Sequence, residues 1–344
     1  MVGIKRILVL GYFGYRTNQL DGQTVKTRNV YQLLVGNNEK VDFYDTQEFH
    51  YKKFSIFKMF AKVCCCSILI YLPAHNNLRY VFPWLFILSK LFRVKICYFV
   101  VGGWLREFLS NKPLHRWMLK RIDGIFSETC QMKSELEQQY GMFNMGVFPN
   151  FRFFDFSPKQ QHDEGKLHLV FMARVNKMKG LDMIFCLGDY LRAVDLDSKI
   201  DISFYGPVND SDKEYFWKNL NKYSFMRYYG ELQPELMYQT LQNYDAMLLP
   251  THYFTEGLPG SIVDAYISGI PVIVTRWKHA TEFVDDGETG FIVPFENGQE
   301  ELNQKVKILF DFPEILNAMK IKAKNRSYDF SAQHAKILMR NITK

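Results

Sequence analysis

The chain has 344 residues, of which 47% are hydrophobic and 23% charged, and it carries a formal net charge of +7. This length is sufficient for two domains that each bury their own core. No apolar segment reaches the roughly 18 residues that a membrane-spanning helix needs, because Lys90, Arg93 and Lys95 interrupt the best candidate. The composition indicates a globular protein and argues against an integral membrane protein. We expect a cytoplasmic location, since residues 1–10 show no secretory signal.

The N-terminal half alternates short apolar runs with amphipathic segments, which is the pattern of a doubly wound parallel sheet. Strands are expected at 6–10, 41–44, 67–72, 95–101, 124–127 and 145–148, and helices at 24–34, 53–62, 83–92, 113–121 and 130–139. Ligands bind at the carboxyl ends of such strands. The loops expected at that edge are 11–23, 73–77 and 102–104.

A polar segment with Pro158 and Gly165 occupies residues 155–165, and we place the domain boundary there. The predicted domains are 1–153 and 154–344, with the last helix as a candidate to pack on the first domain. Strands of the second domain are expected at 167–171, 201–205, 227–229, 246–250, 271–275 and 290–294. One helix is expected to begin at residue 181 and another to end at residue 269. Further helices are expected at 234–242, 299–325 and 331–341. The sequence therefore predicts an α/β protein of two Rossmann-like domains facing across a cleft.

The stretch from Glu256 to Asp264 connects a predicted strand to a predicted helix. Unpaired N–H groups at a helix start and the helix dipole favour an anion there. Glu256 lies beside this anion site, and Asp264, about two helical turns on, can share a face with it. A carboxylate beside an anion site suits a ligand with hydroxyls near a phosphate, such as a nucleotide sugar. The alternative is that Glu256 is a helix-start charge and Asp264 a solvated residue.

A second group of polar residues lies between the strand at 167–171 and the next helix. Arg174 and Lys179 flank this loop at the same edge of the predicted sheet. Two cations beside a helix N-terminus form a good diphosphate site, and arginine can bind two oxygens at once. Lysines at helix starts are common on surfaces, but their pairing with Glu256 and Asp264 makes the prediction much stronger.

Together these motifs resemble the donor-binding domain of the retaining glycosyltransferases of family 4 (glycosyltransferase group 1), which have the GT-B fold. The resemblance is carried by Ala173-Arg174 with Lys179-Gly180, Glu256-Gly257-Leu258-Pro259 with Asp264, Gly269-Ile270-Pro271-Val272, and the run from Glu282 to Phe291. It covers residues 167–294. The N-terminal half matches more loosely, through Asp21-Gly22, Gly102-Gly103 and Pro149-Asn150.

The resemblance implies transfer of a sugar from a nucleoside diphosphate sugar, such as a UDP- or GDP-sugar, with retention of anomeric configuration. By position, the catalytic candidates are Arg174 and Lys179 at the leaving diphosphate and Glu256 at hydroxyls of the donor sugar. Further donor contacts are expected from Gly22, from Gly206, from the backbone amides of Gly257 and Leu258, and from Asp264 at the ribose. No metal or other cofactor is expected, because the two cations and the helix dipole do the work of a metal.

Three positions depart from the family pattern. Asp264 stands where the family has a glutamate, and Ala173 stands where it usually has a glycine. The position before the N-domain glycine turn, where the family often has a histidine, is Val101 or Gly102. His75, which follows another strand of the same domain, is a candidate to substitute for that histidine, and an exposed loop histidine is the alternative. These departures leave a second hypothesis open, a nucleotide-sugar-binding partner subunit with impaired catalysis.

Residues 52–121 carry thirteen basic side chains and one acidic one, Glu107, mixed with bulky apolar residues on predicted helices. This mixture favours an anionic membrane surface over nucleic acid, and no nucleic-acid-binding module is recognisable. We expect a peripheral protein at the inner face of the plasma membrane that acts on a glycan or lipid-linked acceptor, as in assembly of a bacterial capsule, exopolysaccharide or O-antigen. The alternatives are core helices with solvated lysines, and a transferase for a soluble acceptor.

Overall fold

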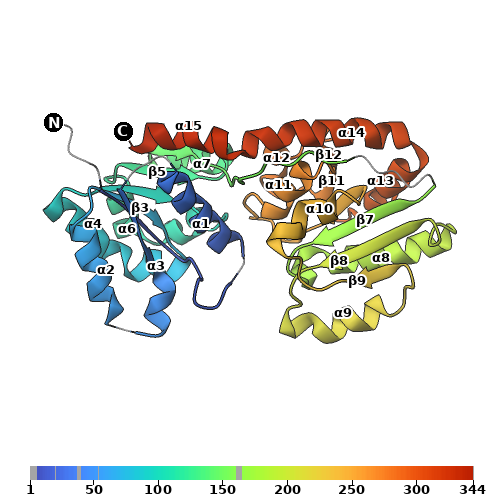
Figure 1. Ribbon diagram of the computed structural model, residues 1–344, viewed down its shortest axis with the longest axis horizontal. Helices are drawn as coiled ribbons and strands as arrows, with labels where there is room; N and C mark the ends of the chain where they lie inside the picture. The colour runs from blue at the N-terminus through green and yellow to red at the C-terminus, as the bar shows by residue number, and fades with distance from the viewer. Residues whose placement is uncertain (1–5, 20, 37–39, 53, 160–164, 344) are drawn as a thin grey trace. The chain divides into compact units, whose positions relative to one another are not determined.

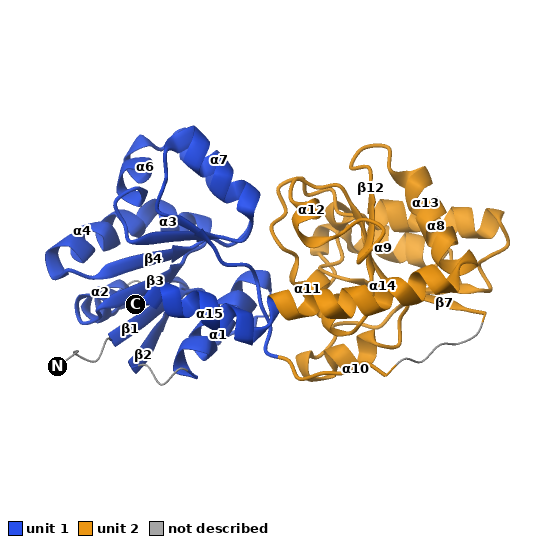
Figure 2. Ribbon diagram, turned by 90° about the horizontal axis from the view of Figure 1, so that it is seen from above, with its two compact units in different colours: residues 1–153, 330–344 blue, residues 154–329 orange. Residues whose placement is uncertain are grey.

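The computed structural model describes residues 6–19, 21–36, 40–52, 54–159 and 165–343. These residues form two compact units, unit 1 (Met1–Phe153 with Phe330–Lys344) and unit 2 (Phe154–Asp329) (Figure 2). The last helix, α15 (Ala332–Thr343), which is the candidate to pack on the first domain, belongs to unit 1. The predicted helix start at residue 53 and residues 160–164 of the polar segment lie outside the described residues.

Unit 1 contains a parallel six-stranded sheet in the order β2-β1-β3-β4-β5-β6. Figure 1 shows helices of this unit around the sheet. The strands are β1 (Arg6–Gly11), β2 (Lys40–Asp45), β3 (Ile68–Leu72), β4 (Lys95–Phe99), β5 (Gly124–Ser127) and β6 (Met145–Val147). The helices are α1 (Gly22–Val35), η1 (Thr46–His50), α2 (Ser55–Cys64), α3 (His75–Tyr80), α4 (Phe82–Phe92), α5 (Leu105–Ser110), α6 (Pro113–Leu119), α7 (Cys130–Tyr140) and α15.

Both faces of this sheet are covered, which explains why its strands read as nearly continuous apolar runs. Side chains alternate between the faces along a strand. In β1, Ile7 and Val9 pack in the core under α1 and α15, whereas Leu8 and Leu10 pack in the core formed with α2 to α7. The predicted doubly wound sheet is thus confirmed for this unit.

Unit 2 repeats the architecture with the strand order β12-β11-β10-β7-β8-β9. The strands are β7 (Leu167–Met172), β8 (Ile200–Tyr205), β9 (Met226–Tyr228), β10 (Ala246–Leu249), β11 (Val272–Thr275) and β12 (Gly290–Val293). The helices are η2 (Lys177–Lys179), α8 (Leu181–Ala193), η3 (Asp210–Asp212), α9 (Lys213–Leu220), η4 (Pro234–Leu236), α10 (Met237–Leu241), α11 (Gly260–Ile267), α12 (Ala280–Phe283), α13 (Gln299–Asp311), α14 (Pro313–Arg326) and η5 (Ser327–Phe330).

Two expectations about helices are wrong. The helix expected at 299–325 is two helices, α13 and α14, because Pro313 has no N–H to continue the first and starts the second instead. The loop expected at 73–77 already contains the start of α3 at His75. No helix in the described part of the chain is both long and apolar enough to cross a membrane.

Candidate active site

The candidate donor site lies where the strand order of unit 2 reverses. The first strand of the unit, β7, has β8 on one side and β10 on the other. Loops that leave two such neighbours in opposite directions open a crevice at their carboxyl ends, which is where ligands bind in open α/β sheets. The loop after β7 carries Arg174 and Lys179, and the loop after β10 carries Glu256. The strand order therefore brings the two loops that carry the catalytic candidates to the same edge of the sheet.

The loop between β7 and α8 is held by its own polar groups. The side chain of Asn176 caps the short helix η2 by accepting a hydrogen bond from the N–H of Lys179 at 2.9 Å. Lys179 is the last residue of η2, and Gly180 follows in the left-handed conformation. Arg174 is exposed and makes no hydrogen bond or ion pair with any residue that the structure describes. Its guanidinium is therefore available to a ligand.

Lys179 and Glu256 form an ion pair, with 2.5 Å between Nζ of the lysine and Oε2 of the glutamate. Their side chains are only 16% and 20% exposed. The ammonium group also lies 5.0 Å from the centroid of the Tyr253 ring. In this ion pair, the predicted diphosphate-binding cation and the predicted sugar-binding carboxylate neutralise each other.

Backbone contacts hold the two loops together. The N–H of His252 donates a hydrogen bond of 2.8 Å to the carbonyl oxygen of Met178. A Cβ atom at Gly180 would lie 2.0 Å from the carbonyl oxygen of Pro250, so only glycine permits the two loops to approach this closely. The distance between Lys179 and Glu256 is thus set by the backbone of both loops.

Three further predicted donor residues of unit 2, Gly257, Leu258 and Asp264, lie just before α11 or on it. Gly257 and Leu258 are buried just before this helix, and its N-cap residue, Pro259, supplies no capping side chain. N–H groups at such a helix start favour an anion. Asp264 is 3% exposed on α11, so it is not a solvated residue. Its predicted contact with a ribose stays a prediction.

Gly206 has a structural role of its own. Its φ is +126°, and a Cβ atom there would lie 2.0 Å from the carbonyl oxygen of Ala173. This glycine lets the loop after β8 pass directly against the loop that carries Arg174. Its position supports the predicted nucleotide site indirectly, through the placement of that loop.

Gly22 of unit 1 lies in a different setting. It is the first residue of α1, where Asp21 and Thr24 form a reciprocal capping box. A Cβ atom at Gly22 would meet no other atom within 4 Å. Packing therefore does not require glycine here, and free space at a helix start is compatible with the predicted approach of a diphosphate.

His75 also lies at the ligand edge of unit 1, as the first residue of α3, which follows β3, the strand paired with β1. It is exposed, and its ring centroid lies 5.1 Å from that of Trp104 and 5.0 Å from that of Phe108. These contacts hold the imidazole beside the Gly102-Gly103 turn. The family that this sequence resembles often has a histidine at that place. Its proposed substitution for that residue remains a hypothesis.

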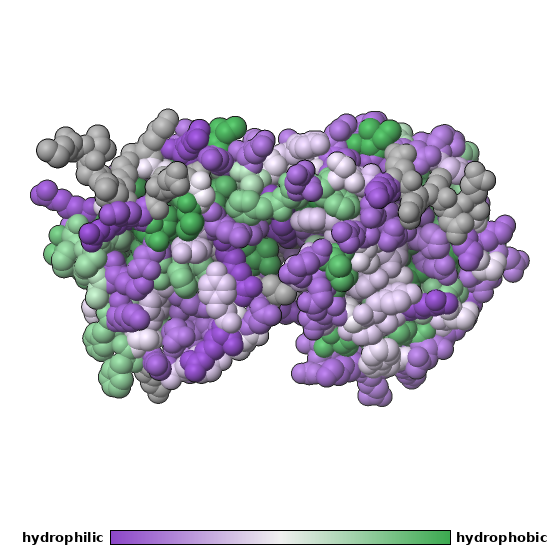
Figure 3. All heavy atoms as spheres, in the orientation of Figure 1, coloured by the Kyte–Doolittle hydropathy of each residue, from purple (hydrophilic) through white to green (hydrophobic). Residues whose placement is uncertain are grey.

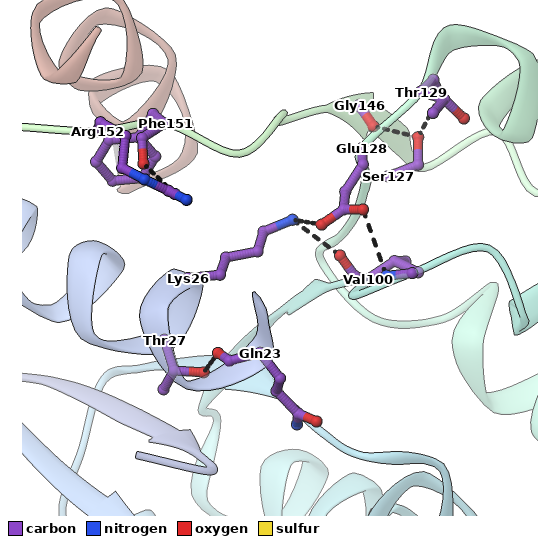
Figure 4. A network of polar contacts seen from close by, with 11 residues as sticks. Gln23, Lys26, Thr27, Val100, Ser127, Glu128, Thr129, Gly146, Phe151 and Arg152 are labelled. Carbon is purple, nitrogen blue, oxygen red and sulfur yellow. Dashed lines mark hydrogen bonds and ion pairs between the residues drawn. The ribbon is translucent and has the colours of Figure 1, made fainter. Parts of the chain in front are cut away.

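A buried ion pair lies beneath this edge of unit 1 (Figure 4). The Nζ atom of Lys26 lies 2.7 Å from Oε1 of Glu128 and donates to the carbonyl oxygen of Val100 at 3.0 Å. The N–H of Gly102 donates to the other carboxylate oxygen at 3.4 Å. Burial lowers the pKa of Lys26, and the neighbouring carboxylate opposes this effect. The pair ties α1 to the loops after β4 and β5.

Sequence reasoning missed this pair. The available signal was helical spacing, because Lys26 precedes Val30 by four residues and Leu33 by seven and so falls on the apolar face of α1. Among the described residues, no cluster of three or more His, Cys, Asp or Glu side chains could hold a metal ion.

Solved structures share this architecture over almost the whole chain. Sucrose-phosphate synthase from Thermosynechococcus elongatus superposes with a TM-score of 0.77 at 12% identity, over 98% of both chains. Alr3699/HepE from Anabaena, solved in complex with UDP and glucose, gives a TM-score of 0.75 at 14% identity, over 98% of this chain and 99% of that chain. The two Rossmann-like units thus have the GT-B fold.

Sequence comparison gives the family. The chain belongs to the family described as glycosyl transferases group 1, whose sequence profile matches residues 153–326, half of the chain. It is also 28% identical over 135 residues to an uncharacterized 41.2 kDa protein in the cps region of Klebsiella pneumoniae. That match spans 39% of this chain and 35% of the Klebsiella protein.

Proposed function

We propose that this protein is a retaining glycosyltransferase that moves a sugar from a nucleoside diphosphate sugar, a UDP- or GDP-sugar, to a glycan or lipid-linked acceptor. The observation that carries the proposal is the ion pair between Lys179 and Glu256 at the strand reversal of unit 2. The unpaired Arg174 lies on the same loop as Lys179. Family membership supports the reaction class. The UDP complex of HepE supports a uridine nucleotide, and the cps-region match supports assembly of a capsule or related polysaccharide.

In this proposal the two cations act on the leaving group. When the bond between the anomeric carbon and the diphosphate breaks, negative charge grows on the diphosphate oxygen. Arg174 and Lys179 interact more strongly with that charge than with the ground state, so they lower the barrier. The acceptor hydroxyl forms the new bond to the anomeric carbon on the face that the diphosphate leaves, and its proton passes to the departing diphosphate oxygen.

The ion pair between Lys179 and Glu256 fits this role. A bound diphosphate offers Lys179 a stronger anionic partner than Glu256, and the freed carboxylate can then accept hydrogen bonds from the hydroxyls of the donor sugar. Binding of the complete donor is therefore favoured over binding of the nucleotide alone. We infer that no metal takes part, because Arg174, Lys179 and the start of α11 supply the positive charge that a metal would provide.

We further propose a peripheral location at the inner face of the plasma membrane, through α2 and α4. Both helices present exposed apolar side chains, which are Phe57 on α2 and Trp84, Ile87, Leu91 and Phe92 on α4. In the region of these helices, hydrophobic side chains lie among hydrophilic ones (Figure 3). Basic and apolar side chains on one surface suit an anionic bilayer. The protein is expected to pellet with anionic vesicles at low salt, and failure to do so contradicts this part.

The donor assignment is tested by calorimetric titration with UDP, GDP, ADP and their sugars. Wild type should bind one nucleotide, and Lys179→Ala should weaken this binding about tenfold or more, the effect of losing one charge-assisted hydrogen bond. Lys177→Ala is the matched control, because Lys177 belongs to the same short helix η2 but points to the Tyr215 ring, 4.3 Å away. Absence of binding by every nucleotide refutes the proposal.

Donor binding without turnover favours the second candidate, an impaired partner subunit. The specific observation behind it is the loop after β4, which has Val101 where the resembling family often has a histidine. Hydrolysis of the bound donor by the isolated chain, followed by NMR of the released sugar, excludes that candidate. The anomer released first reports retention.

A further inference from the structure

Unit 1 contains a groove of about 1040 Å³ that is separate from the predicted donor residues. It runs along β2, the outer strand of the sheet, and is closed on its other side by α2. The loop after β1 contributes Tyr15 and Arg16. Its size is that of a small-molecule binding site.

The groove starts at the ligand edge of the sheet. Gly11 at the end of β1 is paired in parallel with Asp45 at the end of β2, so the loop after β1 and η1 leave the sheet at the same edge. From there α2 runs back beside β2. The hydroxyl of Tyr44 donates to the carbonyl oxygen of Ser55 at 2.8 Å, and Lys62 lies 2.6 Å from Asp42 at the far end. These two contacts fix the walls.

Partly exposed aromatic rings line the groove, and the guanidinium of Arg16 lies 3.8 Å from the centroid of the Tyr51 ring. Tyr15 and Tyr51 are each 48% exposed, and Phe54 is 82% exposed. A folded protein rarely leaves several large rings exposed around one depression unless they meet a ligand. Flat rings of this kind pack against the apolar faces of sugars, and they pack equally well against hydrocarbon.

The charged side chains of the groove that form no ion pair or backbone hydrogen bond with the described residues are basic. Asp45 accepts backbone hydrogen bonds from Phe13, Tyr15 and Gln47, at 3.0, 3.2 and 2.9 Å. Asp42 is paired with Lys62, and Glu48 lies 3.9 Å from Arg16. Lys52 and Lys58, by contrast, form no ion pair with the described residues. Two free ammonium groups beside exposed rings complement an anion such as a phosphate.

An apolar surface continues outward from the groove. The ring of Phe57, which is 66% exposed on α2, stacks on Phe54 with 6.4 Å between centroids. A ligand that matches all these features has a sugar, a phosphate group and a hydrocarbon chain. We propose that this groove binds the phosphate-bearing head of a lipid-linked saccharide acceptor, with Lys52 and Lys58 at the phosphate. This inference rests on the proposed transferase function and adds the acceptor site to it.

The probe is farnesyl diphosphate, a short isoprenoid diphosphate, and hydrogen exchange followed by mass spectrometry locates it on the full chain. Protection is expected in peptides from β2 and α2. Lys58→Glu should raise the dissociation constant for farnesyl diphosphate about tenfold or more. Lys52→Glu is the second variant. Lys218→Glu is the control, because Lys218 is an exposed helical lysine of unit 2 with the same change of charge.

Farnesol and inorganic pyrophosphate separate the possible sources of binding. Protection of the groove by farnesol to the same degree removes the phosphate from the proposal, and equal protection by pyrophosphate removes the lipid. Protection confined to residues 173–180, or unchanged binding by both variants, overturns the proposal. A UDP titration of the same samples keeps the two hypotheses apart. UDP binding that is lost in Lys179→Ala leaves the donor site standing even when the groove does not respond.

Discussion

The Nζ atom of Lys179 lies 2.5 Å from Oε2 of Glu256, although 77 residues separate the two in the chain. One side chain is the predicted partner of the diphosphate, and the other is the predicted partner of the donor sugar. Each of the two charged side chains is about four-fifths buried, and the ion pair gives each of them a counterion. The two charges thus balance each other, and a donor that binds Lys179 through its diphosphate has to exchange this contact for its own.

Replacing Glu256 by Gln tests this exchange. The amide no longer competes for Lys179, so UDP without sugar should bind about two- to fivefold more tightly, the strength of a partly exposed ion pair. Transfer should still fall about tenfold or more, because a charge-assisted hydrogen bond to the sugar is lost. Calorimetry and steady-state kinetics measure the two effects, with the exposed Glu235→Gln as control. Weaker UDP binding by Glu256→Gln contradicts the exchange.

The ion pair between Lys26 and Glu128 should be the more important for stability. Lys26 is 0% and Glu128 3% exposed, so Lys26→Met breaks a buried ion pair, which costs about 3–5 kcal/mol. Adding Glu128→Gln should restore part of this loss. Lys133→Met, at an exposed pair with Glu137, should cost less than about 1 kcal/mol. Urea unfolding measures all four proteins, and equal losses in the two single lysine variants would count against the argument.

The sheets could be predicted from sequence because strands buried on both faces are continuous apolar runs. The helices α3, α5 and α12 could not, since they have six, six and four residues. Segments that short do not complete two turns, and no periodicity can be recognised in them. Their limits depend on the packing of the neighbouring loops.

The donor-site residues could be identified individually, because Arg174, Lys179 and Glu256 each lie in a strand-to-helix loop. The contact between Lys179 and Glu256 could not be predicted, because it depends on β10 pairing with β7. Lys26 was missed for another reason. Lysine is almost never buried without a partner, and its partner here lies 102 residues away.

His115 should make unit 1 sensitive to acid. Its Nε2 lies 3.2 Å from the carbonyl oxygens of both Leu78 and Arg79, and burial lowers the pKa of the imidazole. As the pH falls below the unfolded pKa of about 6.5, the unfolded chain takes up a proton before the folded one. Stability is therefore fully present above that pH and decreases on acidification.

The comparison variant for this effect is His115→Gln, which keeps a donor but does not titrate. Unfolding free energies at pH 7.5, 6.5 and 5.5 should show the wild type losing stability relative to the variant as the pH falls. Other groups that titrate in this range act on both proteins and cancel in the difference. A difference that does not change with pH assigns the acid sensitivity elsewhere.

Gly22 and Gly206, both predicted at the donor, should respond to alanine in opposite ways. At Gly206 the new Cβ would collide with the Ala173 carbonyl, and a φ of +126° strains any other residue, so Gly206→Ala should cost at least about 2 kcal/mol. At Gly22 the methyl group meets open space, and thermal stability should be unchanged. If the donor diphosphate approaches Gly22, Gly22→Ala should lower kcat/KM for the donor about tenfold, while the protein stays folded. Calorimetry and kinetics on both variants separate the two roles, and full activity of Gly22→Ala removes Gly22 from the donor site.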